Sequence, residues 1–159
     1  RRHGLNPSSM TLELTESSVM TEAGRALATL DELSELGVTI SIDDFGTGYS
    51  SLAHLRRLPV NEIKIDKSFV FDLTTNESDE AIVRSMVELG HTLSLRVVVE
   101  GVETVEVRDR LEKIGSDRLQ GYLVSRPLPA VAFEHWMQER RVRTAHDVAS
   151  RVVHLQPRR

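Results

Sequence analysis

One short stretch decides how this chain folds: Val38-Thr39-Ile40-Ser41-Ile42-Asp43. Successive side chains of a strand point to opposite faces, so the three apolar residues share one face and the three polar residues share the other. The apolar face suits packing under a helix, and the acid falls at the carboxyl end of the strand. The stretch therefore predicts a strand of an α/β sheet, with a polar group where such folds gather ligands.

Four further stretches alternate in the same way, so we predict five strands, over residues 10–14, 38–42, 62–65, 96–99 and 118–122. Helical stretches follow them at 21–36, 51–58, 78–95, 105–114 and 130–140. Gly37 is expected to end the first helix, and Ser78 to cap the third. Alternating strands and helices of this length predict an α/β fold with a parallel sheet, either doubly wound or a (β/α) barrel.

The composition is that of an ordinary globular domain. Of 159 residues, 40% are hydrophobic and 28% are charged, which argues against disorder, collagen and coiled coil. A net charge of −4 is too balanced to indicate a nucleic-acid polymer as partner. The chain has no cysteine and no apolar run near the roughly 20 residues of a membrane span. We expect a cytoplasmic protein.

A polar residue lies near the carboxyl end of each predicted strand: Glu13, Asp43, Lys64, Glu100 and Gln120. A single strand-end acid is usually a helix cap, but five such residues on a consistent face are hard to explain as caps. Convergent carboxylates, including Asp44, repel one another unless a cation lies between them, and all-oxygen ligands suit Mg²⁺ or Mn²⁺. In the metal-free alternative these acids cap helices and form local ion pairs. None of the six histidines is assigned a role.

The most distinctive stretch is Asp43-Asp44-Phe45-Gly46-Thr47-Gly48-Tyr49-Ser50-Ser51-Leu52. Its two glycines allow a sharp turn directly after the strand, and a helix is expected to start near Ser50 or Ser51. A kinase site is excluded because no HRD-like loop precedes the stretch and no APE-like motif follows it. A dinucleotide fingerprint is excluded because the third glycine is missing.

Five motifs in order resemble those of the EAL family of bacterial cyclic di-GMP phosphodiesterases. They are Leu12-Glu13-Leu14-Thr15-Glu16-Ser17, the stretch from Asp43 to Leu52, Ile63-Lys64-Ile65-Asp66-Lys67, Glu100-Gly101-Val102-Glu103-Thr104, and Gln120-Gly121-Tyr122 followed by Ser125-Arg126-Pro127-Leu128-Pro129. The resemblance runs from about Leu5 to Trp136. It implies a (β/α)8 TIM-like barrel, two Mg²⁺ or Mn²⁺ ions, and hydrolysis of cyclic di-GMP to linear pGpG.

The resemblance also implies a role for each matching residue. Metal ligation falls to Glu13, Asp43, Asp44 and Glu100, and catalytic roles fall to Lys64, Glu100 and Glu103. Within these roles Lys64 positions the attacking water and Glu103 orients Lys64. Gln120 contacts the substrate or its water network, and Glu16 supports the loop after Asp44. For Glu16 and Glu103 the alternative is a solvated carboxylate at a helix N-terminus.

Part of the family pattern has no counterpart here. The opening Glu-Ala-Leu-x-Arg motif and the metal-binding Asn that follows it are absent, only five βα units fit, and the chain starts at Arg1. We therefore expect the carboxyl-terminal portion of an EAL domain over residues 1–138, an incomplete barrel that is inactive alone. Residues 139–159 are expected to form a basic tail, either a solvated extension or a docking segment.

The expected partners are those of the family. They are cyclic di-GMP, a second copy of the chain in a homodimer, and an upstream sensory or GGDEF-type domain; an upstream segment could anchor the parent protein in a membrane. The rival interpretation is an EAL-type module that senses the nucleotide or docks a partner without catalysis. A truncated gene product without independent function is the third alternative.

Overall fold

The structure, a computed structural model, describes residues 4–48 and 52–153. Tyr49, Ser50 and Ser51, where the sequence predicts the start of the second helix, lie outside the described residues. The chain divides into two compact units, Arg1–Val124 and Ser125–Arg159. The five predicted strands all fall within the first unit.

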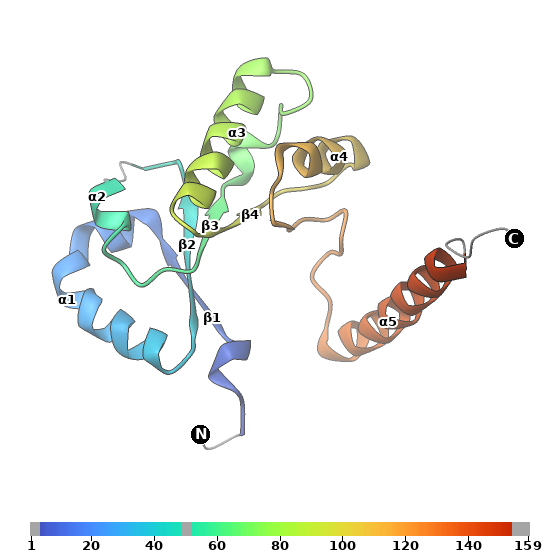
Figure 1. Cartoon of the computed structure of the whole chain (residues 1–159), viewed down its shortest axis with the longest axis horizontal. Helices are drawn as coiled ribbons and strands as arrows, with labels where there is room; N and C mark the ends of the chain where they lie inside the picture. The colour runs from blue at the N-terminus through green and yellow to red at the C-terminus, as the bar shows by residue number, and fades with distance from the viewer. Residues whose placement is uncertain (1–3, 49–51, 154–159) are drawn as a thin grey trace, which may run out of the picture. The chain divides into compact units, whose positions relative to one another are not determined.

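The first unit is built on a parallel sheet (Figure 1). Its strands are β1 (Thr11–Thr15), β2 (Thr39–Phe45), β3 (Glu62–Ile65), β4 (Arg96–Val99) and β5 (Arg118–Leu119), and they lie side by side in chain order. All four neighbouring pairs are parallel. The predicted α/β parallel sheet is confirmed. A doubly wound sheet reverses its strand order at a switch point, whereas the described strands follow one another as in a (β/α) barrel.

The helices of the first unit differ from prediction mainly at their ends. They are α1 (Glu16–Glu35), α2 (Leu52–Leu55), α3 (Glu77–Thr92) and α4 (Val105–Ile114), with 3₁₀ turns η1 (Pro7–Ser9) and η2 (Lys67–Phe69). The prediction that Ser78 caps α3 is wrong: Asn76 is the cap, and its side-chain oxygen accepts a 3.0 Å hydrogen bond from the Ser78 amide. Asn reaches the amide two residues ahead as readily as Ser does.

The second unit contains α5 (Ala130–Val153). This helix continues beyond residue 140, where the sequence analysis ends it, because no Gly or Pro occurs between Ala130 and Pro157 to stop it. Phe133 and Trp136 stack with ring centroids 5.9 Å apart, and the Arg140 guanidinium lies 4.7 Å from the Trp136 ring. The division into residues 1–138 and 139–159 stays a prediction. None of the described helices is long and apolar enough to cross a membrane.

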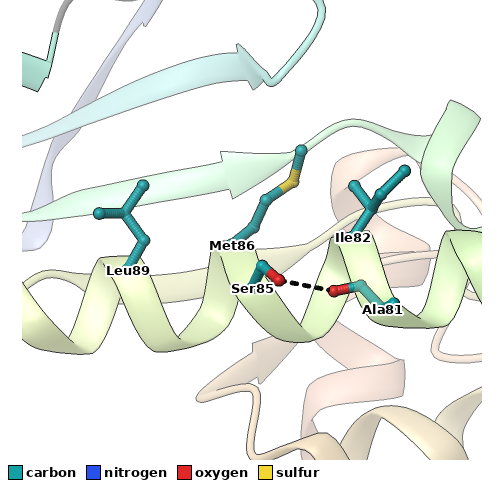
Figure 2. A pocket seen from close by; sticks show the side chains of 5 residues that line it. All are labelled: Ala81, Ile82, Ser85, Met86 and Leu89. Atoms are coloured by element: carbon teal, nitrogen blue, oxygen red, sulfur yellow. Dashed lines mark hydrogen bonds between the residues drawn. The ribbon is translucent and has the colours of Figure 1, made fainter.

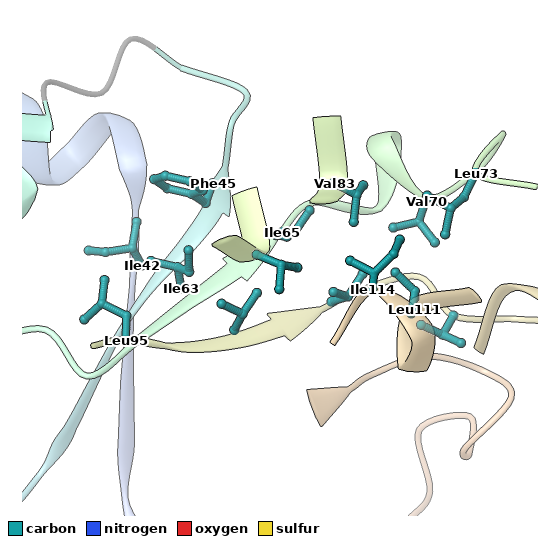
Figure 3. Packing of buried hydrophobic residues seen from close by; sticks show 14 of the residues in the cluster. Ile42, Phe45, Ile63, Ile65, Val70, Leu73, Val83, Leu95, Leu111 and Ile114 are labelled. Carbon is teal, nitrogen blue, oxygen red and sulfur yellow. The ribbon is translucent and has the colours of Figure 1, made fainter. Parts of the chain in front are cut away.

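The core lies between the apolar face of the sheet and the helices α3 and α4 (Figure 3). Strand side chains from alternate positions meet helix side chains in one cluster, which includes Ile42, Ile63, Ile65, Val97, Val99, Val83, Val87, Leu111 and Ile114. Burial of this area is the main term that stabilises the fold. It leaves the opposite face of each strand free for polar groups.

Gly90 allows α3 to approach the sheet closely. A Cβ atom built at this residue would lie 2.4 Å from Val97 Cγ2 and 3.1 Å from Ile63 Cδ1. We expect Gly90→Val to overpack this contact and lower the free energy of unfolding by about 1–3 kcal/mol. Urea denaturation measures the change, with the exposed Glu88→Val on the same helix as a control. Equal stability of the two variants would contradict the close approach.

Candidate functional site

A buried lysine lies at the centre of the polar face. Lys64, on β3, has a side chain that is only 4% exposed. Its Nζ lies 3.0 Å from Glu13 Oε2, 3.0 Å from Asp43 Oδ1 and 2.7 Å from Glu100 Oε1. These acids come from β1, from β2 and from the residue after β4. The parallel order of the strands therefore brings four of the predicted site residues to one point.

The three carboxylates control the charge of this lysine. Burial alone would lower the pKa of Lys64, but hydrogen bonds to Glu100, Glu13 and Asp43 outweigh it and raise the pKa well above its ordinary value. The lysine is therefore an ammonium. Three carboxylates around one ammonium still leave an excess of negative charge, which favours the binding of a further cation.

The donor set fits a hard divalent cation. The acids at Lys64 offer only oxygen ligands, as Mg²⁺ and Mn²⁺ prefer. Asp43 Oδ1 is buried and lies 3.0 Å from the Lys64 ammonium. In the arrangement that the structure describes, no three acid or histidine side chains are placed around a single ion position. They surround the ammonium instead.

The backbone changes direction where β2 ends. The pairing of β2 with β3 shifts register between Ile42 and Phe45, so both aspartates lie in the irregular segment. Asp44 has a φ of 55° and Gly46 a φ of 98°. The Asp44 carbonyl accepts hydrogen bonds from the Thr47 amide (3.2 Å) and hydroxyl (2.8 Å). The glycines predicted a turn here, and the turn follows the acids directly.

Met86 of α3 packs against this turn. A Cβ atom at Gly46 would lie 2.4 Å from the terminal Met86 Cε and 3.0 Å from Phe69 Cε2, and the φ of 98° itself favours glycine. Figure 2 shows the Met86 side chain beside a hollow on α3, lined also by Ala81, Ile82, Ser85 and Leu89. Contact with Met86 therefore joins this helix face to the loop beside Asp43.

Glu16 holds the same loop from the other side. The side chain of this first residue of α1 is buried, with 2% of the residue exposed. Its Oε2 accepts hydrogen bonds from the Gly46 amide (2.9 Å) and the Gly48 amide (3.3 Å). Its Oε1 is buried without a hydrogen-bond partner in the described part of the chain. This geometry is what a residue that supports the loop requires.

The remaining predicted site residues have other surroundings. Gln120 follows β5. Its backbone amide donates to the Val99 carbonyl (2.9 Å), and its backbone carbonyl accepts from the Val102 amide (3.1 Å). Glu103 lines a groove with Val70, Phe71, Gly101, Thr104 and Val107, and the described structure has no ion pair between Glu103 and Lys64. The roles of all the predicted site residues, Glu103, Gln120 and Asp44 among them, stay predictions.

A second polar cluster was not predicted. Glu62, at the start of β3, is 5% exposed and lies 3.3 Å from Arg96 Nη1 and 3.6 Å from Arg118 Nη1. Nearby in the ladder, Ser41 pairs with Glu62 and has a buried hydroxyl without a hydrogen-bond partner among the described residues. The alternation of Glu62 with Lys64 in the sequence indicates that both lie on the polar face of β3. The partners of Glu62 depend on strand register, which the sequence does not show.

Comparison with known proteins adds a family match. The family model described as EAL domain matches residues 1–127. The bifunctional diguanylate cyclase/cyclic di-GMP phosphodiesterase MucR of Pseudomonas aeruginosa is 52% identical over 129 residues, which are 81% of this chain and 19% of MucR. The chain thus spans about a fifth of the length of this curated relative.

Solved structures agree with the fold. The PaMucR phosphodiesterase in complex with c-di-GMP has a TM-score of 0.79 and 51% identity, covering 83% of this chain and 53% of that one. The manganese/cy-diGMP complex of Klebsiella pneumoniae BlrP1 has a TM-score of 0.73 and 39% identity, covering 79% of this chain and 32% of that one.

We expect Glu16→Ala to loosen the loop at Gly46. Loss of the carboxylate leaves two amides without their acceptor, at about 1–3 kcal/mol for each buried group. Hydrogen exchange at the Gly46 and Gly48 amides should then be about 10- to 100-fold faster, since 1.4 kcal/mol is a factor of ten. The control is Glu77→Ala, an exposed acid that begins α3. Unchanged exchange in Glu16→Ala would contradict the support role.

Proposed function

The chain belongs to the EAL domain family, and from this premise we propose that it supplies site residues of a phosphodiesterase that hydrolyses cyclic di-GMP to linear pGpG. The observation that carries this proposal is the convergence of Glu13, Asp43 and Glu100 on Lys64. The named activity of MucR and the c-di-GMP bound to the PaMucR phosphodiesterase support the choice of substrate.

Two divalent cations, Mg²⁺ or Mn²⁺, belong to the proposal. Glu13, Asp43, Asp44 and Glu100 are the residues that would hold them, and the convergence of three of these carboxylates on one ammonium, with an excess of negative charge, supports this assignment. When bound, such ions supply an activated water and neutralise charge on the phosphodiester. The BlrP1 complexes with manganese and with calcium support a divalent cation in this family.

The chain's own residues orient the reactants. An ammonium has three N–H donors and no acceptor, so Lys64 cannot take up a proton. Its three donors face the three carboxylates, and when cations occupy those acids an N–H would become available to the attacking water and to a phosphoryl oxygen. Glu13, Asp43 and Glu100 hold Lys64 in place, and Glu16 holds the loop that follows Asp44. We assign to Gln120 the contact with the substrate or its water network, and to Glu103 the orientation of Lys64.

The proposal extends to the partners. We place this site in a homodimer and in a protein that also carries a sensory or GGDEF-type domain. The bifunctional name of MucR supports the second domain. The homodimer is carried over from the family resemblance. A cytoplasmic location is likewise proposed.

The carboxylates at Lys64 provide the direct test. In the protein that contains this chain, we expect Asp43→Asn and Glu13→Gln each to reduce cyclic di-GMP hydrolysis with Mg²⁺ or Mn²⁺ by on the order of 100-fold or more, because each removes a charged ligand. Release of pGpG is measured by chromatography. The exposed Asp72→Asn is the control.

Three outcomes separate the alternatives. Full hydrolysis by either variant would overturn the ligand assignment. Tight binding of cyclic di-GMP without hydrolysis by the wild-type protein would favour a nucleotide receptor. Loss of both binding and hydrolysis in the wild type would overturn the proposed substrate.

Lys64→Ala tests the role of the ammonium. If Lys64 acts on the attacking water, kcat should fall by about 100-fold while KM changes by no more than about threefold. Steady-state kinetics give both values, and urea denaturation confirms that the variant is folded. Lys113→Ala, an exposed lysine of α4, is the matched control. A change in KM alone would assign Lys64 to substrate binding instead.

A further inference from the structure

The strand that presents Gln120 is very short. Only Arg118 and Leu119 lie in β5, where they pair with Val98 and Val99. Leu119 packs against the hydrophobic cluster, so Gln120 belongs to the opposite face. A slip of one residue would exchange these two side chains between the faces. Pairing at only two positions does little to prevent such a slip.

Asp117 supplements the ladder directly before β5. Its amide donates to the Val97 carbonyl (3.0 Å), and its Oδ2 accepts from the Val97 amide (2.7 Å). His91 Nε2, at the end of α3, lies 3.0 Å from the same Oδ2. Burial would raise the pKa of Asp117, but the Val97 amide and His91 lower it below the ordinary value. Asp117 therefore binds β4 through both main chain and side chain.

Arg118 forms an ion pair on the face of β5 opposite to Leu119. Its guanidinium reaches Glu62, which is also paired with Arg96. Glu62 belongs to β3 and Arg96 to β4, so the contact spans three strands. A shift of β5 along β4 would break this contact and the bonds of Asp117 together. The two faces of β5 thus specify the same register.

We propose that Asp117 is a positioning residue that sets the register of β5 on β4 and so places Gln120 on the face that carries Lys64 and Glu100. Asp117 touches no reacting group and acts through Gln120. At the far end the Val102 amide binds the Gln120 carbonyl, so Gln120 is held between Asp117 and Val102. The consequence for turnover rests on the proposed phosphodiesterase function, whereas the consequence for register does not.

Hydrogen exchange tests the register in the protein that contains this chain, whatever its activity. In Asp117→Ala we expect the Gln120 and Val97 amides to exchange at least about tenfold faster, while β2 and β3 amides stay unchanged, because the Val97 amide loses its charged acceptor locally. Asp117→Asn retains an oxygen for the Val97 amide and should remain within about threefold of wild type. Asp109→Ala, an exposed acid paired with Arg108, is the control.

A double-mutant cycle separates positioning from general stability. If Asp117 acts through Gln120, Asp117→Ala lowers kcat/KM in the wild type but changes it by less than about twofold in a Gln120→Ala background. Equal losses in both backgrounds would overturn the proposal, as would unchanged exchange at Gln120. If Asp117→Ala does not fold, Asp117→Glu, whose carboxylate is one methylene farther out, carries the same comparisons. Normal register effects without any hydrolysis would count against the function alone.

Discussion

One buried ammonium holds the ends of the strands together. Lys64 contacts an acid from β1, an acid from β2 and the acid after β4. Removal of the lysine would leave three carboxylates close together without their cation, which is destabilising. The three carboxylates are held apart from one another and close to the lysine by the same parallel ladder. Site and sheet therefore depend on each other.

β3 contributes side chains both to the core and to the polar site. Ile63 and Ile65 are fully buried in the core beneath α3, while Lys64 between them faces the acids. The free energy gained by burying the apolar face offsets the cost of gathering charges on the other face. The close contact of Gly90 with Val97 and Ile63 keeps the helix on that apolar face. A shift of the core that moves β3 would therefore also move Lys64.

The period-two pattern of the strands was enough to predict the parallel α/β sheet and the face on which Lys64 and Glu100 lie. It could not predict the partners of Glu62, because pairing with Arg96 and Arg118 depends on how three separate strands align. The choice of Asn76 over Ser78 as helix cap is likewise a matter of local geometry. The left-handed conformation of Asp44 coincides with the register shift in β2, and the pattern of side chains predicts neither feature.

The two ends of the sheet carry different sets of polar residues. Acids and Lys64 gather at the carboxyl ends of the strands, while Glu62, Arg96, Asp117 and Arg118 lie at or just before the amino ends. In a parallel sheet a residue at one end of a strand determines which side chain appears on each face at the other end. For a strand as short as β5, the contacts of Asp117 and Arg118 add to those of the ladder. The placement of Gln120 thus depends on polar contacts made before it in the chain.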